Sequence, residues 1–309
     1  MKKIYYITAV FATLFLVGCG DGIDLPGVNV ETDLNKIPLP DNNVNLEQVE
    51  LKPSTEPMLH EGLHTEEDFQ RIRDKKAAGE EPWISAYQLL VESQFSQKTA
   101  DTYPTEWIKR GVSGDENYMN AARGATIAYQ QALRWKIEQD DEYAAKAVEN
   151  LNKWVQTCVG VTGNTNLSLA AGLYGYEFAI AGELLRDYGG WDRADFAAFQ
   201  NWLLKVFYPA NDDFLKRHHD TNALHYWANW CLCNIAAKMA IGIVTDRRDI
   251  YNEGIAHLQT GDTNGRLRRA IYHDYAPDYN FAQWQESGRD QGHTLMCVGL
   301  MGIICQLAW

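Results

Sequence analysis

Apolar side chains recur every three or four positions along most of the chain after residue 65, which is the period of an amphipathic helix. Capping and turn residues divide this pattern into separate segments, such as Thr65 before three acidic residues and Gly79 after the same segment. The predicted helices span residues 65–78, 83–95, 117–138, 141–158, 167–186, 192–207, 219–243, 249–258 and 285–307. Segments with a strand period are few and short, so the sequence predicts an all-α fold.

The predicted helices follow one another as hairpins joined by turns. Two architectures are built from repeated helical hairpins: a closed (α/α) toroid, and an open superhelical solenoid. The hydrophobic period is the same in both, and the chain carries no strict solenoid repeat. The pattern alone leaves both architectures open.

The first residues differ from the rest of the chain. Lys2 and Lys3 precede an apolar run of about fourteen residues, which is the length of a signal-peptide core and short for a membrane span. The run ends in Leu16-Val17-Gly18-Cys19, which resembles a bacterial lipobox. This resemblance implies a signal peptide at 1–18, cleavage before Cys19 and lipidation of its thiol. We therefore expect a lipid-anchored protein of the periplasm or outer-membrane surface.

Residues 19–57 are rich in Asp, Asn, Pro and Gly and lack a helical or strand period, so we interpret them as a flexible tether. The folded domain is expected at 58–309. Its last predicted helix runs to Gln306-Leu307-Ala308-Trp309 without a capping residue, which suggests that the domain lacks its natural C-terminal part.

Composition narrows the choice of partner. The chain has 46% hydrophobic residues, enough for a sizeable core, and a formal net charge of −13, which argues against nucleic acid as a general partner. Ten Trp and sixteen Tyr are available for stacking on sugar rings, although most aromatic side chains belong to cores. Beyond Cys19, the five cysteines lie in apolar helical stretches without metal-ligand spacing, so we predict buried thiols and no metal site.

Two segments combine polar and ionisable groups with apolar helix formers. In a helix over 219–243, four side chains would share one face that lines a cleft: Asn222, His225, Tyr226 and Asn229. In a helix over 285–307, Glu286, Arg289 and His293 would likewise share a face. The alternatives are a satisfied polar layer or an N-terminal capping cluster for the first segment, and an exposed Glu286–Arg289 ion pair for the second. The stretch from Arg266 to Tyr279 is a basic, tyrosine-rich loop that either binds substrate or is simply solvated.

Several short motifs point to one family. They include Leu63-His64-Thr65-Glu66-Glu67-Asp68-Phe69, Gly175-Tyr176, Asn229-Trp230 and Gln285-Glu286-Ser287-Gly288-Arg289-Asp290-Gln291 with His293-Thr294. With them, the chain from about His60 resembles the alginate lyase superfamily of bacterial polysaccharide lyases. The resemblance implies an α/α toroid, an acidic polysaccharide as substrate, and contacts from Tyr176 and Trp230 to that substrate.

The chain departs from the best-known branch of that family at two places. There the site Asn and His are adjacent, whereas here Asn222, His225 and Asn229 are separated. The branch also has a tyrosine shortly after its site arginine, where this chain has Leu295. The tyrosine must therefore come from elsewhere, and Tyr272 and Tyr226 are the candidates.

β-Elimination on a uronate needs a clamp on the carboxylate, a base for the C5 proton and an acid for the leaving O4. We assign Asn229, Arg289 and Glu286 to the clamp, with Asn222 as second choice for the amide. His225 or His293 is the expected base, and Tyr272 or Tyr226 the acid. No metal or organic cofactor is required. The competing hypotheses are a glycan-binding surface lipoprotein without catalysis and a helical-toroid glycoside hydrolase.

Overall fold

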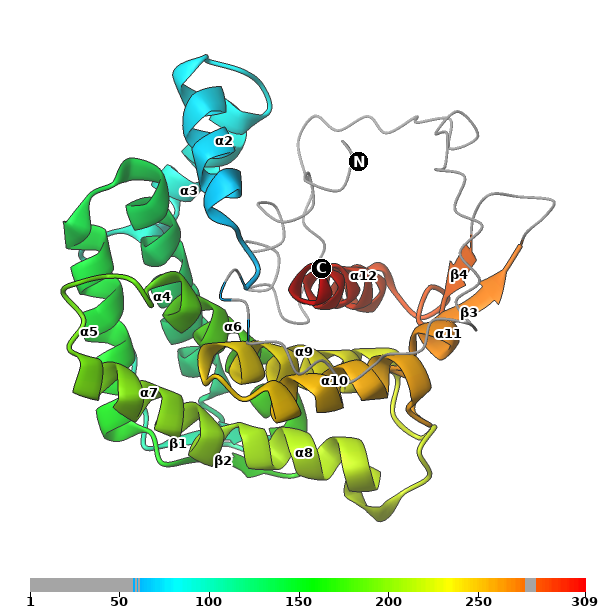
Figure 1. Cartoon of the computed structure of the whole chain (residues 1–309). Helices are drawn as coiled ribbons and strands as arrows, with labels where there is room; N and C mark the ends of the chain where they lie inside the picture. Colours follow the sequence, from blue (N-terminus) through cyan, green and yellow to red (C-terminus); the bar gives the residue numbers. More distant parts are fainter. Residues whose placement is uncertain (1–57, 59, 61, 276–281) are drawn as a thin grey trace.

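The computed structural model describes residue 58, residue 60 and residues 62–275 and 282–309 (Figure 1). The predicted signal peptide (1–18), lipidated Cys19, tether (19–57) and the end of the tyrosine-rich loop at 276–279 lie outside the described residues. These features stay predictions from the sequence.

The described chain is mostly helical, with few and short strands, so the all-α prediction is confirmed. The helices are α2 (Glu66–Ala77), α3 (Trp83–Glu92), α4 (Tyr118–Glu138), α5 (Asp141–Thr157), α6 (Leu167–Leu184), α7 (Arg193–Val206), α8 (Tyr208–Arg217), α9 (Ala228–Val244), α10 (Arg248–Thr260), α11 (Leu267–Ala270) and α12 (Gln291–Ala308), with 3-10 turns at Gln94–Ser96 and His218–Asp220. Four short strands complete it: β1 (Trp107–Arg110), β2 (Gly160–Gly163), β3 (Ile271–Asp274) and β4 (Ala282–Trp284).

The long helices form two layers. In the inner layer, α4 packs on α6, α6 on α9, and α9 on α12 (Figure 1). Helices α5, α7, α8 and α10 pack on the outside of this row. The arrangement is a row of helical hairpins, and its closure into a toroid stays a prediction. By length and composition alone α12 passes as a membrane-spanning helix, but its contacts with α9 make it part of the inner layer.

The inner helices all begin at the same end of the molecule. Strand β1, just before α4, pairs in parallel with β2, just before α6. Ser168 in the first turn of α6 is 3.1 Å from the ring of His219, ahead of α9. The Asn229 N–H, at the start of α9, donates to Glu286, ahead of α12. Short polar contacts thus link the starts of α4, α6, α9 and α12, and the candidate site residues lie among them.

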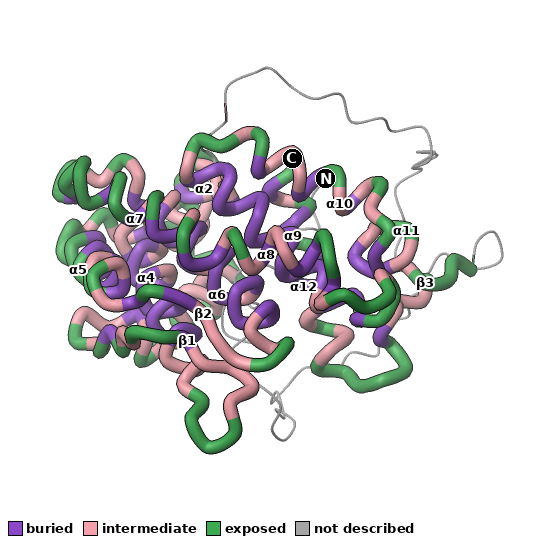
Figure 2. Tube along the Cα trace, turned by 90° about the horizontal axis from the view of Figure 1, so that it is seen from below, coloured by how far each residue is buried: buried purple, intermediate pink, exposed green. Residues whose placement is uncertain are grey.

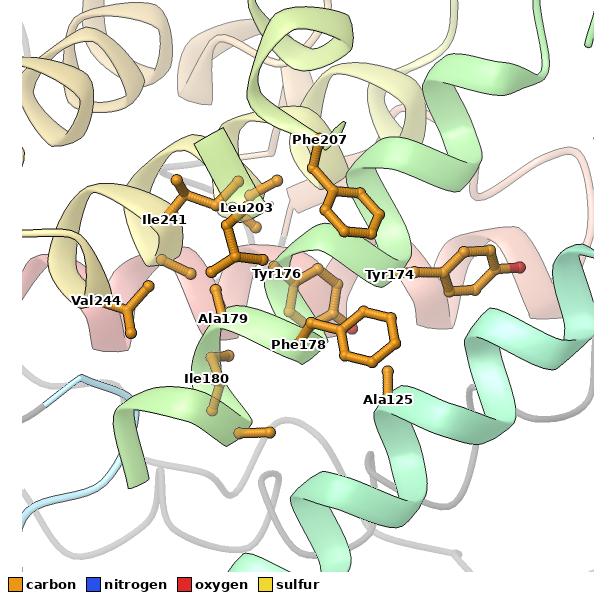
Figure 3. Packing of buried hydrophobic residues seen from close by; sticks show 14 of the residues in the cluster. Ala125, Tyr174, Tyr176, Phe178, Ala179, Ile180, Leu203, Phe207, Ile241 and Val244 are labelled. Atoms are coloured by element: carbon orange, nitrogen blue, oxygen red, sulfur yellow. The ribbon is translucent and has the colours of Figure 1, made fainter. Parts of the chain in front are cut away.

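An aromatic core holds the two layers together. Phe178 of α6 packs against Phe207 and Trp202 from the α7–α8 region, with ring centroids 5.9 and 5.2 Å apart (Figure 3). Inner helices approach closely where side chains are small: a Cβ at Gly172 would lie 2.5 Å from the Cys233 sulfur. Helices α4, α6 and α9 are accordingly buried over most of their length, whereas α12, the outer helices and the β3 hairpin have many exposed or half-buried residues (Figure 2).

Two predicted helices begin later than the sequence pattern indicated. The helix expected at 219–243 begins at Ala228, because His218, His219 and Asp220 have left-handed backbone angles that end α8 and start a loop. The helix expected at 285–307 begins at Gln291, because the Asp290 side chain caps it by accepting from the His293 N–H. The pattern also missed α8 as a separate helix. Four of the five predicted buried thiols are buried, and Cys305 is exposed.

Candidate functional site

The segment before α12 satisfies the exposed backbone donors at the start of α9. The first N–H groups of a helix have no partner within the helix. Here the Ala228 N–H donates to Gln285 Oε1 at 2.8 Å, and the Asn229 N–H donates to Glu286 Oε1 at 3.3 Å. Residues far apart in sequence therefore meet at one helix terminus, where the partial positive charge of the helix favours a carboxyl group.

Glu286 is the centre of this contact. Its side chain is 0% exposed, and its second oxygen, Oε2, accepts from Arg289 Nη1 at 3.2 Å. The Cys297 thiol of α12 also lies 3.5 Å from Oε1, and burial raises the pKa of that thiol to about 12. The alternative of an exposed Glu286–Arg289 pair is wrong, because the carboxyl group is buried against α9 and α12.

Arg289 is held at one side and open at the other. Its Nη1 binds Glu286, and its Nε lies 3.7 Å from Asp290 Oδ2. The side chain nevertheless stays 44% exposed. A guanidinium that is oriented by protein carboxyl groups and still accessible is suited to binding an anionic ligand.

Asn229 lies on the other side of Glu286 and has an unused polar atom. Its side chain is buried, yet its Oδ1 has no hydrogen-bond partner among the described residues. Such an atom typically costs about 1–3 kcal/mol of folding free energy, so proteins seldom retain one without a use. A ligand hydroxyl or amide at this place would complete the bonding of the Asn229 amide.

His293 is oriented by an aspartate. Its Nδ1 lies 2.6 Å from Asp290 Oδ2, while the other oxygen of Asp290 accepts from the His293 N–H. Those hydrogen bonds lower the pKa of Asp290, with the backbone bond as the largest cause. The pairing fixes the ring and leaves Nε2 for proton transfer. Asp290 was missed as a site residue, although an Asp three positions before His293 is the signature of a helix cap.

The prediction that Glu286, Arg289 and His293 share a helical face is wrong, because only His293 belongs to α12. A turn over residues 285–289 brings the other two beside it instead.

The prediction that Asn222, His225, Tyr226 and Asn229 share a helical face is also wrong, because residues 221–227 form a loop. Asn222 is exposed and accepts from the Leu224 N–H. His225 is exposed as well, with its ring centroid 4.9 Å from that of Tyr226. Tyr226 is buried against Phe214, His219 and Trp230, the last with centroids 4.6 Å apart. The loop thus packs Tyr226 on Trp230, which follows Asn229 in α9, and leaves Asn222 exposed.

The two remaining candidates lie elsewhere. Tyr272 is 68% exposed on β3, in the hairpin that extends away from the inner layer (Figures 1 and 2). Tyr176 is buried in α6, where its hydroxyl donates to Glu177 at 3.4 Å; burial raises the pKa of Tyr176 well above its usual value. Among residues 62–275 and 282–309, no group of three or more His, Cys, Asp or Glu side chains suited to a metal ion is found.

The fold and these contacts define an all-α protein that gathers an amide, a guanidinium and a carboxylate-oriented imidazole at one end of its inner helices. The chain belongs to the alginate lyase family: the family profile, described as alginate lyase, matches residues 72–276. At the level of the family, it is a polysaccharide lyase. The match includes Asn229 and ends before the segment from Glu286 to His293. Searches of curated proteins and of solved structures gave no match to this chain.

Proposed function

We propose that this protein cleaves a uronic-acid-containing polysaccharide, of alginate or glucuronan type, by β-elimination. The observation that carries this proposal is Glu286, whose carboxyl group joins the start of α9 at Asn229 to Arg289. Two groups able to bind a sugar carboxylate are thereby brought from separate segments to one place.

In this mechanism Arg289 and the Asn229 Nδ2 group donate to the carboxylate at C5, and the unpartnered Asn229 Oδ1 accepts from a sugar hydroxyl. Neutralising that carboxylate stabilises the enolate-like transition state that forms when the C5 proton leaves. Glu286 acts as a positioning residue, because both its oxygens are already engaged by protein donors. Asn222, the second choice for the amide, is exposed in the loop and has no comparable contact with Arg289.

His293 is the better-supported base. Its Nδ1 lies 2.6 Å from Oδ2 of Asp290, the residue that follows Arg289. A carboxylate partner orients an imidazole and stabilises its protonated form after proton transfer. His225 remains the alternative, but its ring is exposed in the loop without a carboxylate partner among the described residues.

The acid that protonates the leaving O4 is assigned to Tyr226. It precedes Asn229 by three residues and packs on Trp230, whereas Tyr272 lies on the exposed hairpin. Trp230, which is partly exposed, also offers aromatic surface for a sugar ring.

Two other functions were considered. A glycoside hydrolase needs one carboxyl group that donates a proton and a second that activates water or attacks. Glu286 accepts hydrogen bonds from Asn229 and Arg289, and Asp290 is paired with His293. Both nearby carboxyl groups are therefore engaged by protein groups, which disfavours a role as proton donor or as the group that activates water. A purely glycan-binding protein has no need for a carboxylate-oriented histidine, which favours the lyase.

The lyase activity is tested by incubating the purified protein with polymannuronate, polyguluronate, polyglucuronate and a neutral polysaccharide. Elimination creates a double bond that absorbs in the ultraviolet, so absorbance should rise on at least one polyuronate and stay flat on the neutral control. Product masses distinguish elimination from hydrolysis, because hydrolysis adds water. No rise on any polyuronate, or products that carry the added water, would overturn the proposal.

The anchor through Cys19 is part of the same proposal and is supported by the lipobox-like sequence at 16–19. Mass spectrometry of the mature N-terminus after expression in a bacterium should find a lipidated Cys19. A Cys19→Ser variant should be released from the membrane fraction, and a wild-type protein without lipid would contradict the assignment.

A further inference from the structure

Arg110 is a second cation near the inner helices, and the mechanism above does not use it. It is the last residue of β1, paired with Gly163 of β2. A Cβ at Gly163 would lie 1.7 Å from the Arg110 carbonyl oxygen, so this pairing requires glycine and fixes the Arg110 backbone closely. The side chain therefore starts from a rigid position just before α4.

Among the residues that the structure describes, the guanidinium of Arg110 has no anionic partner. It lies over the ring of Tyr118, the first residue of α4, at 4.6 Å. Its Nη1 is buried and forms no hydrogen bond within the described chain. Other arginines, such as Arg134 and Arg186, pair with carboxyl groups in this acidic protein. An oriented guanidinium without a counter-ion is costly for folding, which indicates that a ligand supplies the missing anion.

The surroundings place Arg110 on the same side of the inner layer as Asn229. Burial raises the pKa values of Tyr174 in α6 and Cys233 in α9, and the charge of Arg110 opposes both shifts. Cys233 lies one helical turn after Asn229, at the close contact between α6 and α9 made by Gly172. The Tyr174 hydroxyl points away from the Phe178 core (Figure 3). Arg110 therefore faces a region bounded by α4, α6 and the first turns of α9.

We propose that Arg110, stacked on Tyr118, binds the carboxylate of a second uronate in the same polysaccharide chain as the one that is cleaved. This inference rests on the proposed lyase function and adds a binding residue to it: Arg110 binds a uronate other than the one that is cleaved, so neutral sugars beside the cleaved uronate should weaken binding. Arg110 contributes to substrate binding, whereas Arg289 and Asn229 stabilise the transition state.

The test is Arg110→Met, which keeps the length of the side chain and removes its charge. On a polyuronate, KM should rise about 10- to 100-fold, the cost of one lost charge-assisted hydrogen bond, while kcat stays within about 3-fold. Arg123→Met is the matched control, because Arg123 also lies near the start of α4 over a tyrosine ring, that of Tyr103. Its KM should match that of the wild type.

A structural role predicts a different result. If Arg110 only supported the fold, Arg110→Met would lower the melting temperature and leave KM unchanged. A binding role predicts an unchanged or higher melting temperature, because no carboxyl group is orphaned by the substitution.

Partially carboxyl-reduced polyuronate supplies the second arm. Reduction should raise KM for the wild type more than for Arg110→Met, since the variant has already lost the contact. An active wild type with an unchanged KM in Arg110→Met overturns this inference alone. A wild type that is inactive on every polyuronate overturns the lyase proposal. In that case, affinity electrophoresis in polyuronate gels tests whether Arg110 binds the polymer. Equal retardation of the wild type and of Arg110→Met would overturn the binding role of Arg110 too.

Discussion

At the scale of single residues, Arg289 is the side chain on which the proposed chemistry depends most. Arg289→Ala removes the exposed guanidinium and should lower kcat/KM by roughly 100- to 1,000-fold, the range found when one donor to a developing oxyanion is lost. The loss should appear mainly in kcat, because the enolate-like charge forms only in the transition state. Initial rates of ultraviolet absorbance on the best polyuronate measure it.

The control for Arg289→Ala is Arg217→Ala. Arg217 is a surface arginine of α8 that pairs with Asp213 and Asp220 and is of similar exposure. The Arg217→Ala variant should retain the wild-type rate. Near-normal activity in Arg289→Ala, with normal folding by circular dichroism, would remove Arg289 from the clamp.

Glu177 in α6 is expected to make the free energy of unfolding depend on pH. Its Oε2 is buried without a partner in the described chain, and burial raises the pKa of Glu177 from 4.5 to about 8. The folded protein therefore holds this proton more tightly than the unfolded chain does. The corresponding stability is fully present below pH 4.5 and is lost as pH rises toward 8.

Glu177→Gln cannot ionise and should escape this loss. The variant should match the wild type near pH 4.5 and exceed it by roughly 1–3 kcal/mol at pH 8.5, the usual cost of a buried polar group without a partner. Urea unfolding at the two pH values measures the difference. Parallel pH dependence in both proteins would show that Glu177 does not titrate with a raised pKa.

At the scale of elements, one lysine joins three helices. Lys238 of α9 is 0% exposed, and its Nζ lies 2.8 Å from Asp212 of α8 and 2.5 Å from Glu253 of α10. Lys238→Met removes the cation shared by Asp212 and Glu253 and leaves Asp212 with only the exposed Lys216 as a partner. Since both carboxyl groups are partly exposed, the expected loss is about 1–3 kcal/mol, less than for a fully buried pair.

Urea unfolding compares Lys238→Met with Lys216→Met, which removes an exposed partner of the same Asp212. The control should lie within about 0.5 kcal/mol of the wild type. Equal losses in the two variants would mean that burial of the Lys238 charge adds nothing to the packing of α8, α9 and α10.

The sequence predicted the elements better than their starts. The 3.6-residue period identified α4 and α5 within a few residues, because each leaves part of its surface exposed. Helix α6 was also identified within a few residues, although it is buried on nearly all sides. It failed before α9, since Tyr226 and Trp227 continue the apolar pattern through a loop whose shape depends on left-handed backbone at His218 and His219. Helical propensity does not predict where left-handed backbone ends a helix and starts a loop.

The candidate site residues were chosen for reasons that were partly wrong. Asn229, Arg289 and His293 stood out as polar groups beside apolar helices, but the expected helical faces do not exist. What brings them together is the contact of Glu286 with the start of α9, between residues 57 positions apart. A local pattern cannot contain such a contact. Arg110 was missed because an arginine at the end of a short strand has no distinguishing spacing.

At the scale of the whole molecule, the protein and its proposed substrate carry charges of the same sign. The chain has a net charge of −13, and the proposed substrate is a polyanion. The cations assigned to binding, Arg289 and Arg110, lie near the starts of the inner helices, whose partial positive charges add to theirs. Attraction is therefore local, whereas repulsion is spread over the surface and acts at longer range.

This difference in range predicts an unusual dependence on salt. The screening length falls from about 30 Å at 0.01 M to about 8 Å at 0.15 M, which removes long-range repulsion and leaves close contacts largely intact. On a long polyuronate, kcat/KM should rise several-fold over that interval, through faster association, before falling at higher salt. A short oligouronate carries fewer charges and should show a weaker rise. A decline in kcat/KM from the first addition of salt would mean instead that the cations around Arg289 and Arg110 already dominate the field met by the approaching chain.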